Sequence, residues 1–226
     1  VIRSGKDMET QALEDILKDT PRVVYKPKDG SGGAGIQVFD KKDYPDVSVL
    51  ADELRSLPDG VVEQWIGQHE SMSTAYPDAV NCIRVATLYR DGVCHWLGAV
   101  FTLGRNHSKI TNSFQGALFG LIDVETGIVT TDLCSYSDEL FKVHPDTGFV
   151  ARGFQVPYWK EILELTAKAA AVVPQVGYVG WDVAIAENGP VLIEGNSVSA
   201  GYYGYQHYML REDGMGSRAV WEPYTI

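Results

Sequence analysis

Two long runs of β-forming residues, separated by a short turn, occupy residues 80–103. The first run reads VNCIRVATLY and the second reads VCHWLGAVFTL, with Arg90, Asp91 and Gly92 between them. An Asp-Gly pair between two apolar runs predicts a tight turn, so the two runs should pair as an antiparallel hairpin. The segment WDVAIAENGPVLIEGN, residues 181–196, predicts a second hairpin. Antiparallel strands of this kind, mixed with helices, predict an α+β fold.

Helices are predicted around these strands wherever apolar residues recur at helical spacing. The segments with this spacing are residues 8–19, 47–57 and 158–173. The pattern of the chain changes near residue 67, before the long β-forming runs. Because no internal repeat or low-complexity linker interrupts the chain, this change should separate two lobes of one functional unit. We expect a smaller lobe from 1 to 66 and a larger lobe from 67 to 226.

The charge and composition of this 226-residue chain narrow the classes of partner. Nineteen Lys and Arg against 30 Asp and Glu give a formal net charge of −11, which repels nucleic-acid phosphates, so no nucleic-acid partner is expected. The apolar runs are much shorter than the roughly 20 residues of a membrane helix, so no membrane span is expected. Three cysteines without Cys-x-x-Cys spacing favour reduced thiols and a cytoplasmic location. The chain begins at Val1 without a signal peptide, and we expect a segment upstream of it.

A glycine-rich loop lies between two apolar runs in VVYKPKDGSGGAGIQVF, residues 23–39. Glycine amides can approach an anion closely because no side chain intervenes, which favours a phosphate ligand. The loop residues assigned to this role are Gly30, Ser31, Gly32 and Gly33, followed by Gly35. Lys26 precedes them on a strand, from which its ammonium group can reach the phosphates. The spacing is neither that of a P-loop nor G-x-G-x-x-G, and a plain hairpin loop is the alternative.

The segment EQWIGQHE, residues 63–70, follows a short predicted strand at 61–66. A strand with a free backbone edge can hydrogen-bond a planar base, and Glu63 and Glu70 would lie on either side of that contact. Taken alone, the segment is an ordinary strand and turn. Its order behind Lys26 and the glycine-rich loop is what favours a nucleotide.

Two registers of the second hairpin are compatible with its sequence. A two-residue turn at Asn188 and Gly189 would bring the charge of Glu194 into the apolar face. A three-residue loop that begins at Glu187, with glycine in the left-handed bulge position, pairs Asp182 with Glu194. We choose this second register because it keeps charge out of the buried face.

The chosen register sorts the hairpin residues onto two faces. The apolar face would carry Val183, Ile185, Val191 and Ile193, and the polar face would carry Asp182, Glu194 and Asn196. Two carboxylates and an amide offer hard oxygen ligands, which suit Mg²⁺ better than zinc. Phosphate oxygens and water would complete the coordination. The alternative is a solvent-facing polar row at the rim of a sheet.

The ordered set resembles the ATP-grasp enzymes: a strand lysine, a glycine-rich loop, EQWI with a glutamate a few residues on, and an acidic hairpin. Further segments are similar to those of the sugar-transfer-associated ATP-grasp proteins, relatives of the glutamate-ligase-like group: NCIRVATL, TNSFQGALFGLIDVETG, HPDTG, VPYW and GWDVAIAENGPVLIEGN. The resemblance covers about Val23 to Gln206. It implies two α+β lobes with mostly antiparallel sheets that clasp ATP between them, residues 1–66 with the phosphate loop and 67–226 with the metal-binding hairpin. It also implies a preceding N-terminal domain, which this sequence does not include.

Residue by residue, the resemblance assigns ligand roles. Lys26 would bind the α and β phosphates of ATP, and the glycine-rich loop would cover the β and γ phosphates. Glu63 and the backbone of Gln64 and Ile66 would bind adenine, and Glu70 would bind the ribose hydroxyls. The two carboxylates and the amide of the hairpin would hold one or two Mg²⁺ ions.

The chemistry implied by the resemblance is attack of a substrate carboxylate on the γ phosphate. The resulting acylphosphate is then displaced by an amine or another nucleophile. Arg84 and Arg105 are the candidates to neutralise the charge that develops in these steps. Many amide-forming members carry an arginine two residues before the first metal aspartate, where this chain has Gly180. Either Arg84 or Arg105 replaces that charge, or the chemistry is not ordinary amide ligation.

We therefore expect an ADP-forming, ATP- and Mg²⁺-dependent ligase that acts on a small-molecule, peptide or sugar carboxylate and a nucleophilic acceptor. Two alternatives remain: a phosphotransferase acting on a hydroxyl, since one fold can host several chemistries, and a nucleotide-binding module without turnover. The presence of all three predicted metal ligands argues against the second alternative.

Overall fold

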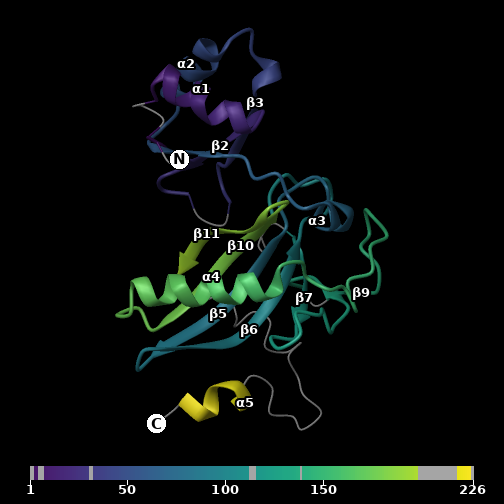
Figure 1. The fold of residues 1–226 in the computed structure, drawn as a ribbon. Coiled ribbons are helices and arrows are strands. Elements are labelled where there is room, and N and C mark those ends of the chain that lie inside the picture. The colour runs from purple at the N-terminus through teal and green to yellow at the C-terminus, as the bar shows by residue number, and fades with distance from the viewer. Residues whose placement is uncertain are drawn as a thin grey trace. The chain divides into compact units, whose positions relative to one another are not determined.

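The computed structural model describes residues 3–4, 8–30, 33–111, 116–137, 139–197 and 218–224 (Figure 1). The chain forms two compact units, Val1–Gly67 (unit 1) and Gln68–Ile226 (unit 2). Each contains helices and an antiparallel sheet. The predicted α+β class is therefore confirmed.

Unit 1 is built on a four-stranded sheet in the order β1-β4-β2-β3, with every neighbouring pair antiparallel. Its elements are β1 (Arg3–Ser4), α1 (Thr10–Asp19), β2 (Arg22–Pro27), β3 (Gln37–Asp40), a 3₁₀ turn (Lys41–Asp43), α2 (Val47–Ser56) and β4 (Gly60–Gln64). The predicted helices at 8–19 and 47–57 correspond to α1 and α2 and are confirmed.

The core of unit 1 lies between one face of this sheet and the helices α1 and α2. Leu13 and Leu17 of α1 and Leu50 of α2 are buried in it, together with alternate residues of β2 such as Tyr25. Asp46 caps α2 by accepting hydrogen bonds from the backbone amides of the first turn. Because strand side chains alternate between faces, the residues between the buried ones lie on the sheet face away from this core.

Unit 2 is built on a seven-stranded sheet in the order β11-β10-β5-β6-β7-β8-β9, also antiparallel throughout. Its elements are α3 (Glu70–Ala75), β5 (Cys82–Arg90), β6 (Val93–Leu103), β7 (Leu118–Ile122), β8 (Leu133–Cys134), β9 (Leu140–Phe141), α4 (Trp159–Val172), β10 (Tyr178–Ala186), β11 (Gly189–Asn196), α5 (Arg218–Trp221) and a 3₁₀ turn (Glu222–Tyr224). The β5–β6 hairpin predicted at residues 80–103 is confirmed, with its turn at Asp91 and Gly92.

The two faces of the unit 2 sheet differ. On one face α4 packs across β5, β10 and β11 (Figure 1), over a core that includes Ile83, Val183 and Ile162. On the other face a smaller apolar cluster contains Val100 and Trp221. Arg84 and Asp182 alternate with the core residues along their strands, so their side chains belong to this second face.

The β10–β11 hairpin confirms one half of its predicted register and corrects the other. Asp182 pairs with Glu194, as predicted. The predicted three-residue loop is wrong. Ala186 pairs with Gly189, so only Glu187 and Asn188 connect the two strands. A β-bulge at Asp182 and Val183 restores the predicted pairing beyond it.

The bulge also changes which apolar residues of β11 reach the core. Leu192, rather than Ile193, lies opposite Val183 and packs against the main core. Val191, predicted on the buried face, is exposed. The predicted apolar face is therefore wrong for β11 and correct for Val183 and Ile185, both fully buried.

Candidate functional site

Asp182, Glu194 and Asn196, here called the hairpin cluster, converge on one face of the unit 2 sheet. Asp182 lies directly opposite Glu194, and Asn196 lies opposite Gly180. The Asn196 Nδ2 atom is 3.4 Å from Asp182 Oδ2 and 3.4 Å from Glu194 Oε1. Two cross-strand pairs that are neighbours on the same face of the hairpin thus gather two carboxylates and one amide.

Arg84 joins this cluster from the neighbouring strand. It is the cross-strand partner of Asp182 on β5 and donates to both carboxylate oxygens, from Nε to Oδ1 and from Nη2 to Oδ2 at 2.7 Å. This two-pronged geometry is the strong form of an arginine–carboxylate pair. Arg84 therefore places a positive charge on the sheet face that also contains Gly180, the position at which many amide-forming members carry an arginine.

The electrostatic balance at Asp182 reflects this setting. Burial raises the pKa of the Asp182 carboxyl above its ordinary value, Arg84 acts in the opposite direction, and nearby Glu194 raises it again. A nearby positive charge stabilises the ionised form of a carboxyl that is buried in this way. Arg84 provides one such charge, and a metal ion would add to it.

The hairpin cluster fits a hard divalent cation by the chemistry of its donor atoms. Carboxylate and amide oxygens are the ligands of Mg²⁺, which also keeps several waters or phosphate oxygens. Within the described ranges no group of three or more His, Cys, Asp or Glu gathers as a metal site.

Arg105 lies apart from the hairpin cluster in its contacts. It follows β6, and its Nη1 is 3.6 Å from Glu139 Oε2. Its guanidinium carbon lies 5.5 Å from the ring centroid of Phe141, and its side chain is 19% exposed. Its Nε is buried without a hydrogen-bond partner in the described part of the chain. The structure brings Arg84, and not Arg105, into contact with Asp182.

In unit 1, Lys26 and Glu63 form an ion pair across β2 and β4. Lys26 Nζ is 2.6 Å from Glu63 Oε2, and both side chains are about a quarter exposed, 26% and 27%. Glu63 lies opposite Val24, two residues from Lys26. Lys26 and Glu63 therefore share the sheet face that is not covered by the unit 1 core.

The glycine-rich loop connects the antiparallel neighbours β2 and β3, as expected. Gly33 and Gly35 have φ values of 80° and 76°, which side chains rarely adopt. A Cβ on Gly30 would lie 2.8 Å from the carbonyl oxygen of Ala34, so this position also requires glycine. Ser31 and Gly32 lie outside the described residues. The described glycines are thus fixed by backbone geometry.

The backbone edge of β4 differs in part from the prediction. The prediction that the backbone edge is free along the whole strand is wrong, because β1 pairs with Val61 and Val62. Further along, the Trp65 amide donates to the Arg22 carbonyl of β2 at 3.2 Å. Backbone groups alternate in direction along a strand, so those of Gln64, the last residue of β4, point away from β2.

Glu70 begins α3 in unit 2. Its amide donates to Glu187 Oε1, in the turn between β10 and β11, at 2.8 Å. Its side chain is exposed. Sequence reasoning placed Glu187 only in the hairpin loop and missed its contact with Glu70, because nothing local links residues that are 117 positions apart.

A model of the family described as "Sugar-transfer associated ATP-grasp" matches residues 1–207. The chain belongs to this ATP-grasp family. The resemblance inferred from the motifs is thereby confirmed. Among curated proteins, none matches the chain.

Solved structures share the ATP-grasp fold with this chain. The ADP complex of N5-carboxyaminoimidazole ribonucleotide synthetase, PurK, matches at TM-score 0.53 and 12% identity over 97% of this chain and 46% of its own. The ATP-grasp ligase PsnB, complexed with minimal precursor, Mg and ADP, matches at 0.52 and 13%, over 97% and 52%. Biotin carboxylase from Campylobacter jejuni, in a β-γ-ATP complex, matches at 0.52 and 15%, over 100% and 43%. The chain therefore spans about half the length of these structures.

Proposed function

We propose that this ATP-grasp chain is an ADP-forming ligase that uses MgATP to activate a substrate carboxylate for attack by an amine or another nucleophile. The observation that carries the proposal is the convergence of Asp182, Glu194 and Asn196 beside Arg84. Family membership supports the use of ATP, and the fold's relatives include ligases crystallised with ADP.

In this proposal residues of unit 1 bind the phosphates and the adenine of the nucleotide. Lys26 exchanges Glu63 for the α and β phosphates, which is feasible because their ion pair is partly exposed to solvent. The loop containing Gly30, Ser31, Gly32 and Gly33 covers the β and γ phosphates. The outward-pointing backbone of Gln64 supports contact with adenine, to which Glu63 and Ile66 are also assigned. Glu70 binds the ribose.

The hairpin cluster of unit 2 holds Mg²⁺ in this proposal. Bound there, the ion would supply positive charge to the phosphate oxygens during phosphoryl transfer. Asp182 and Glu194 provide the carboxylate ligands, and Asn196 provides its amide oxygen. Arg84 orients Asp182 through the paired hydrogen bonds described above and opposes the effect of burial on the pKa of its carboxyl.

The proposed reaction has two steps, a phosphoryl transfer and an acyl transfer. A carboxylate oxygen of the substrate attacks the γ phosphorus and ADP leaves, so that an acylphosphate forms. The nucleophile then attacks the acyl carbon, phosphate leaves and the nucleophile loses a proton. Arg84 beside the metal ligands, and Arg105 with its incompletely bonded guanidinium, are assigned to the anionic groups in these steps.

The acyl substrate is a small molecule, peptide or sugar that carries a carboxylate, and the reaction takes place in the cytoplasm, where MgATP is available. None of the helices in the described ranges is long and apolar enough to cross a bilayer, and α4 covers 14 residues.

The function is tested by incubating the purified chain with ATP, Mg²⁺ and a panel of carboxylates and amines, with ADP and AMP measured separately. We expect carboxylate-dependent ADP release, lost with EDTA and in an Asp182→Asn variant. Release of AMP would contradict the acylphosphate route. A stable phosphate ester of a hydroxyl substrate would favour the phosphotransferase alternative, for which the absence of an arginine at Gly180 is the supporting observation.

A further inference from the structure

The sequence motif HPDTG, residues 144–148, forms a tight turn that has no role in the proposed chemistry. The carbonyl of His144 accepts from the Gly148 amide at 2.8 Å, and the His144 amide donates to the Phe149 carbonyl at 2.8 Å. Gly148 has a φ of 73°, which suits the final glycine of the motif. The turn is therefore a defined unit, called here the HPDTG turn.

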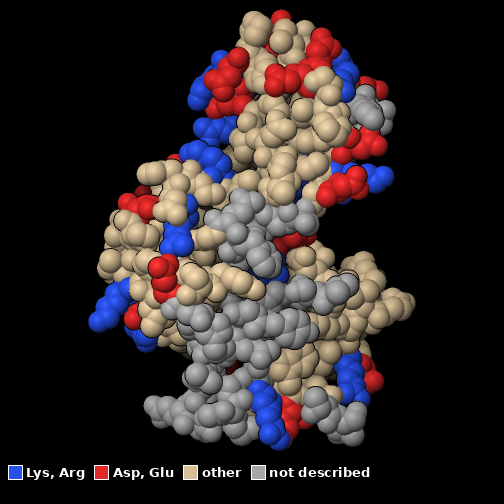
Figure 2. All heavy atoms as spheres, turned by 180° about the vertical axis from the view of Figure 1, so that it is seen from behind, with Lys and Arg blue, Asp and Glu red and all other residues tan. Residues whose placement is uncertain are grey.

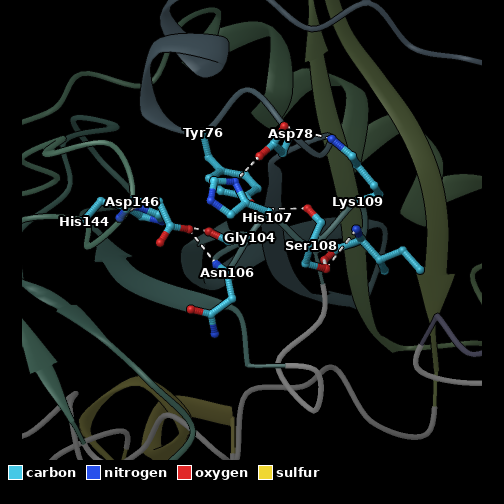
Figure 3. A network of polar contacts seen from close by, with 10 residues as sticks. Tyr76, Asp78, Gly104, Asn106, His107, Ser108, Lys109, His144 and Asp146 are labelled. Atoms are coloured by element: carbon cyan, nitrogen blue, oxygen red, sulfur yellow. Dashed lines mark hydrogen bonds and ion pairs between the residues drawn. The ribbon is translucent and has the colours of Figure 1, made fainter.

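The HPDTG turn binds the backbone on both sides of Arg105 (Figure 3). His144 is fully buried, and its Nε2 donates to the carbonyl oxygen of Gly104 at 2.7 Å. The Asp146 carboxylate accepts from the amide of Asn106 at 2.6 Å. Two residues of one turn thus hold the residue before Arg105 and the residue after it.

His144 is suited to this contact by its tautomer. The Gly104 carbonyl can only accept, so Nε2 must carry a proton. The other ring nitrogen, Nδ1, accepts from the Asp146 amide at 3.3 Å and therefore has a lone pair. The imidazole thus links Asp146 within the turn to the backbone of the segment that it holds.

Other contacts fix the same segment. The Ser108 amide donates to the Arg105 carbonyl at 3.1 Å, and the Tyr76 hydroxyl donates to the Ser108 carbonyl at 3.0 Å. A Cβ at Gly104 would lie 2.4 Å from the Tyr76 ring, so only glycine permits this approach. The segment is closely held on several sides.

The backbone after Arg105 adopts a costly conformation. Asn106 and His107 both have left-handed φ values, 58° and 56°. Asp78 contacts His107 Nδ1 at 3.0 Å and Lys109 Nζ at 2.8 Å (Figure 3). Such backbone persists only where surrounding contacts hold it.

We infer that the HPDTG turn is a positioning device for Arg105, which it holds ready for the anionic group of the acyl substrate. The role of Arg105 toward the substrate rests on the proposed function, whereas the contacts between the turn and residues 104–106 do not depend on it. The turn acts on the backbone of residues 104–106, and the guanidinium stays on the Phe141 ring near Glu139. His144 and Asp146 are positioning residues in this account.

The variants that test this inference remove different contacts of the HPDTG turn. Asp146→Ala removes the acceptor of the Asn106 amide, whereas Asp146→Asn keeps an acceptor oxygen at the same place. Thr147→Val is the matched control. The Thr147 hydroxyl donates to the Ala75 carbonyl at 2.9 Å and accepts from the Phe149 amide at 3.3 Å, and neither partner belongs to residues 104–106. His144→Gln provides a second test from the other side of Arg105.

The first measurement is the rate at which phenylglyoxal modifies Arg105, followed by peptide mass spectrometry. Loss of one hydrogen bond should make Arg105 about threefold to tenfold more reactive in Asp146→Ala, with Asp146→Asn and Thr147→Val close to wild type. His144→Gln should also raise the rate. Equal rates in Asp146→Ala and wild type, or equal increases in Asp146→Ala and Thr147→Val, would overturn the inference.

The second measurement is a double-mutant cycle on ADP-forming turnover, with MgADP affinity measured by calorimetry. Asp146→Ala should lower kcat about threefold to tenfold in the wild-type background and have no further effect in an Arg105→Gln background. Additive losses would overturn the positioning role. If the wild-type chain fails to bind MgADP, the proposed function falls, while the phenylglyoxal rates still decide whether the turn holds Arg105.

Discussion

Each unit joins a basic and an acidic side chain across neighbouring strands of its sheet, and the two pairs are built differently. Lys26 and Glu63 in unit 1 meet through one contact, with 26% and 27% of their side chains exposed. Arg84 and Asp182 in unit 2 meet through two hydrogen bonds, with 21% and 15% exposed. The unit 1 pair is suited to exchange of its partner for a ligand, whereas the unit 2 pair is suited to keep its geometry.

Both signs of charge are present on the side of the molecule shown in Figure 2. There the Lys and Arg side chains of unit 1 lie among Asp and Glu side chains.

The largest effect should come from neutralising the arginines. Arg84→Gln or Arg105→Gln should lower carboxylate-dependent ADP formation by about 10²–10³, because an anionic intermediate loses a preorganised donor. ATP affinity should stay within a few-fold, as measured by calorimetry. If neither variant changes turnover, the ligase proposal, which assigns these arginines to the anionic groups of the reaction, is contradicted.

The next effect concerns stability. Asp182→Ala should lower the free energy of unfolding by about 3 kcal/mol, because Arg84 loses its two-pronged partner in a largely buried setting. The matched variant in unit 1, Glu63→Ala, should cost less than about 1 kcal/mol, because its pair is more exposed. Urea denaturation in EDTA measures both. Equal losses would remove the distinction between the pairs.

Nucleotide binding should respond to the unit 1 pair. Lys26→Ala should weaken ATP binding by about 1.5–3 kcal/mol, the value of a charge-assisted contact to phosphate. Lys28→Ala is the control, since Lys28 lies just beyond β2 and has no assigned ligand role. Calorimetric affinity that is unchanged in Lys26→Ala would exclude its phosphate role.

The smallest effect should appear at another acidic residue of unit 1. Arg22, and then the Lys42 amide, lower the pKa of Asp40 from 3.8 to about 2. The stability from this group should be present above pH 3.8 and be lost as the pH falls from 3.8 to about 2. Comparing the acid unfolding of wild type with Asp40→Asn measures it. A wild-type advantage that grows as the pH falls would contradict this sign.

Sequence patterns predicted the parts of the fold that depend on local alternation and helical spacing. The β5–β6 hairpin, the helices of unit 1 and the pairing of Asp182 with Glu194 follow from such patterns. The β11 bulge did not, because Val191, Leu192 and Ile193 are all apolar and alternation cannot tell which one is extra. A bulge is set by packing on both faces, which the sequence does not display.

The sequence was enough to propose residues for the candidate site, but not to predict the contacts among them. The oxygen donors of Asp182, Glu194 and Asn196, gathered on one strand pair, favoured a metal site. The partnership of Arg84 with Asp182 required the register between β5 and β10, which are far apart in sequence. The role of the HPDTG turn likewise depends on contacts 40 residues apart.

The most direct test of the ligase proposal is the fate of the substrate's carboxylate oxygen. The chain is incubated with ATP, Mg²⁺, an amine panel and carboxylates labelled with ¹⁸O, and the phosphate released is examined by mass spectrometry. An acylphosphate transfers one carboxylate oxygen to phosphate, so we predict phosphate that carries one ¹⁸O atom for each ADP formed. ADP formation with unlabelled phosphate, or with the phosphoryl group retained on a hydroxyl of the product, would contradict the proposal.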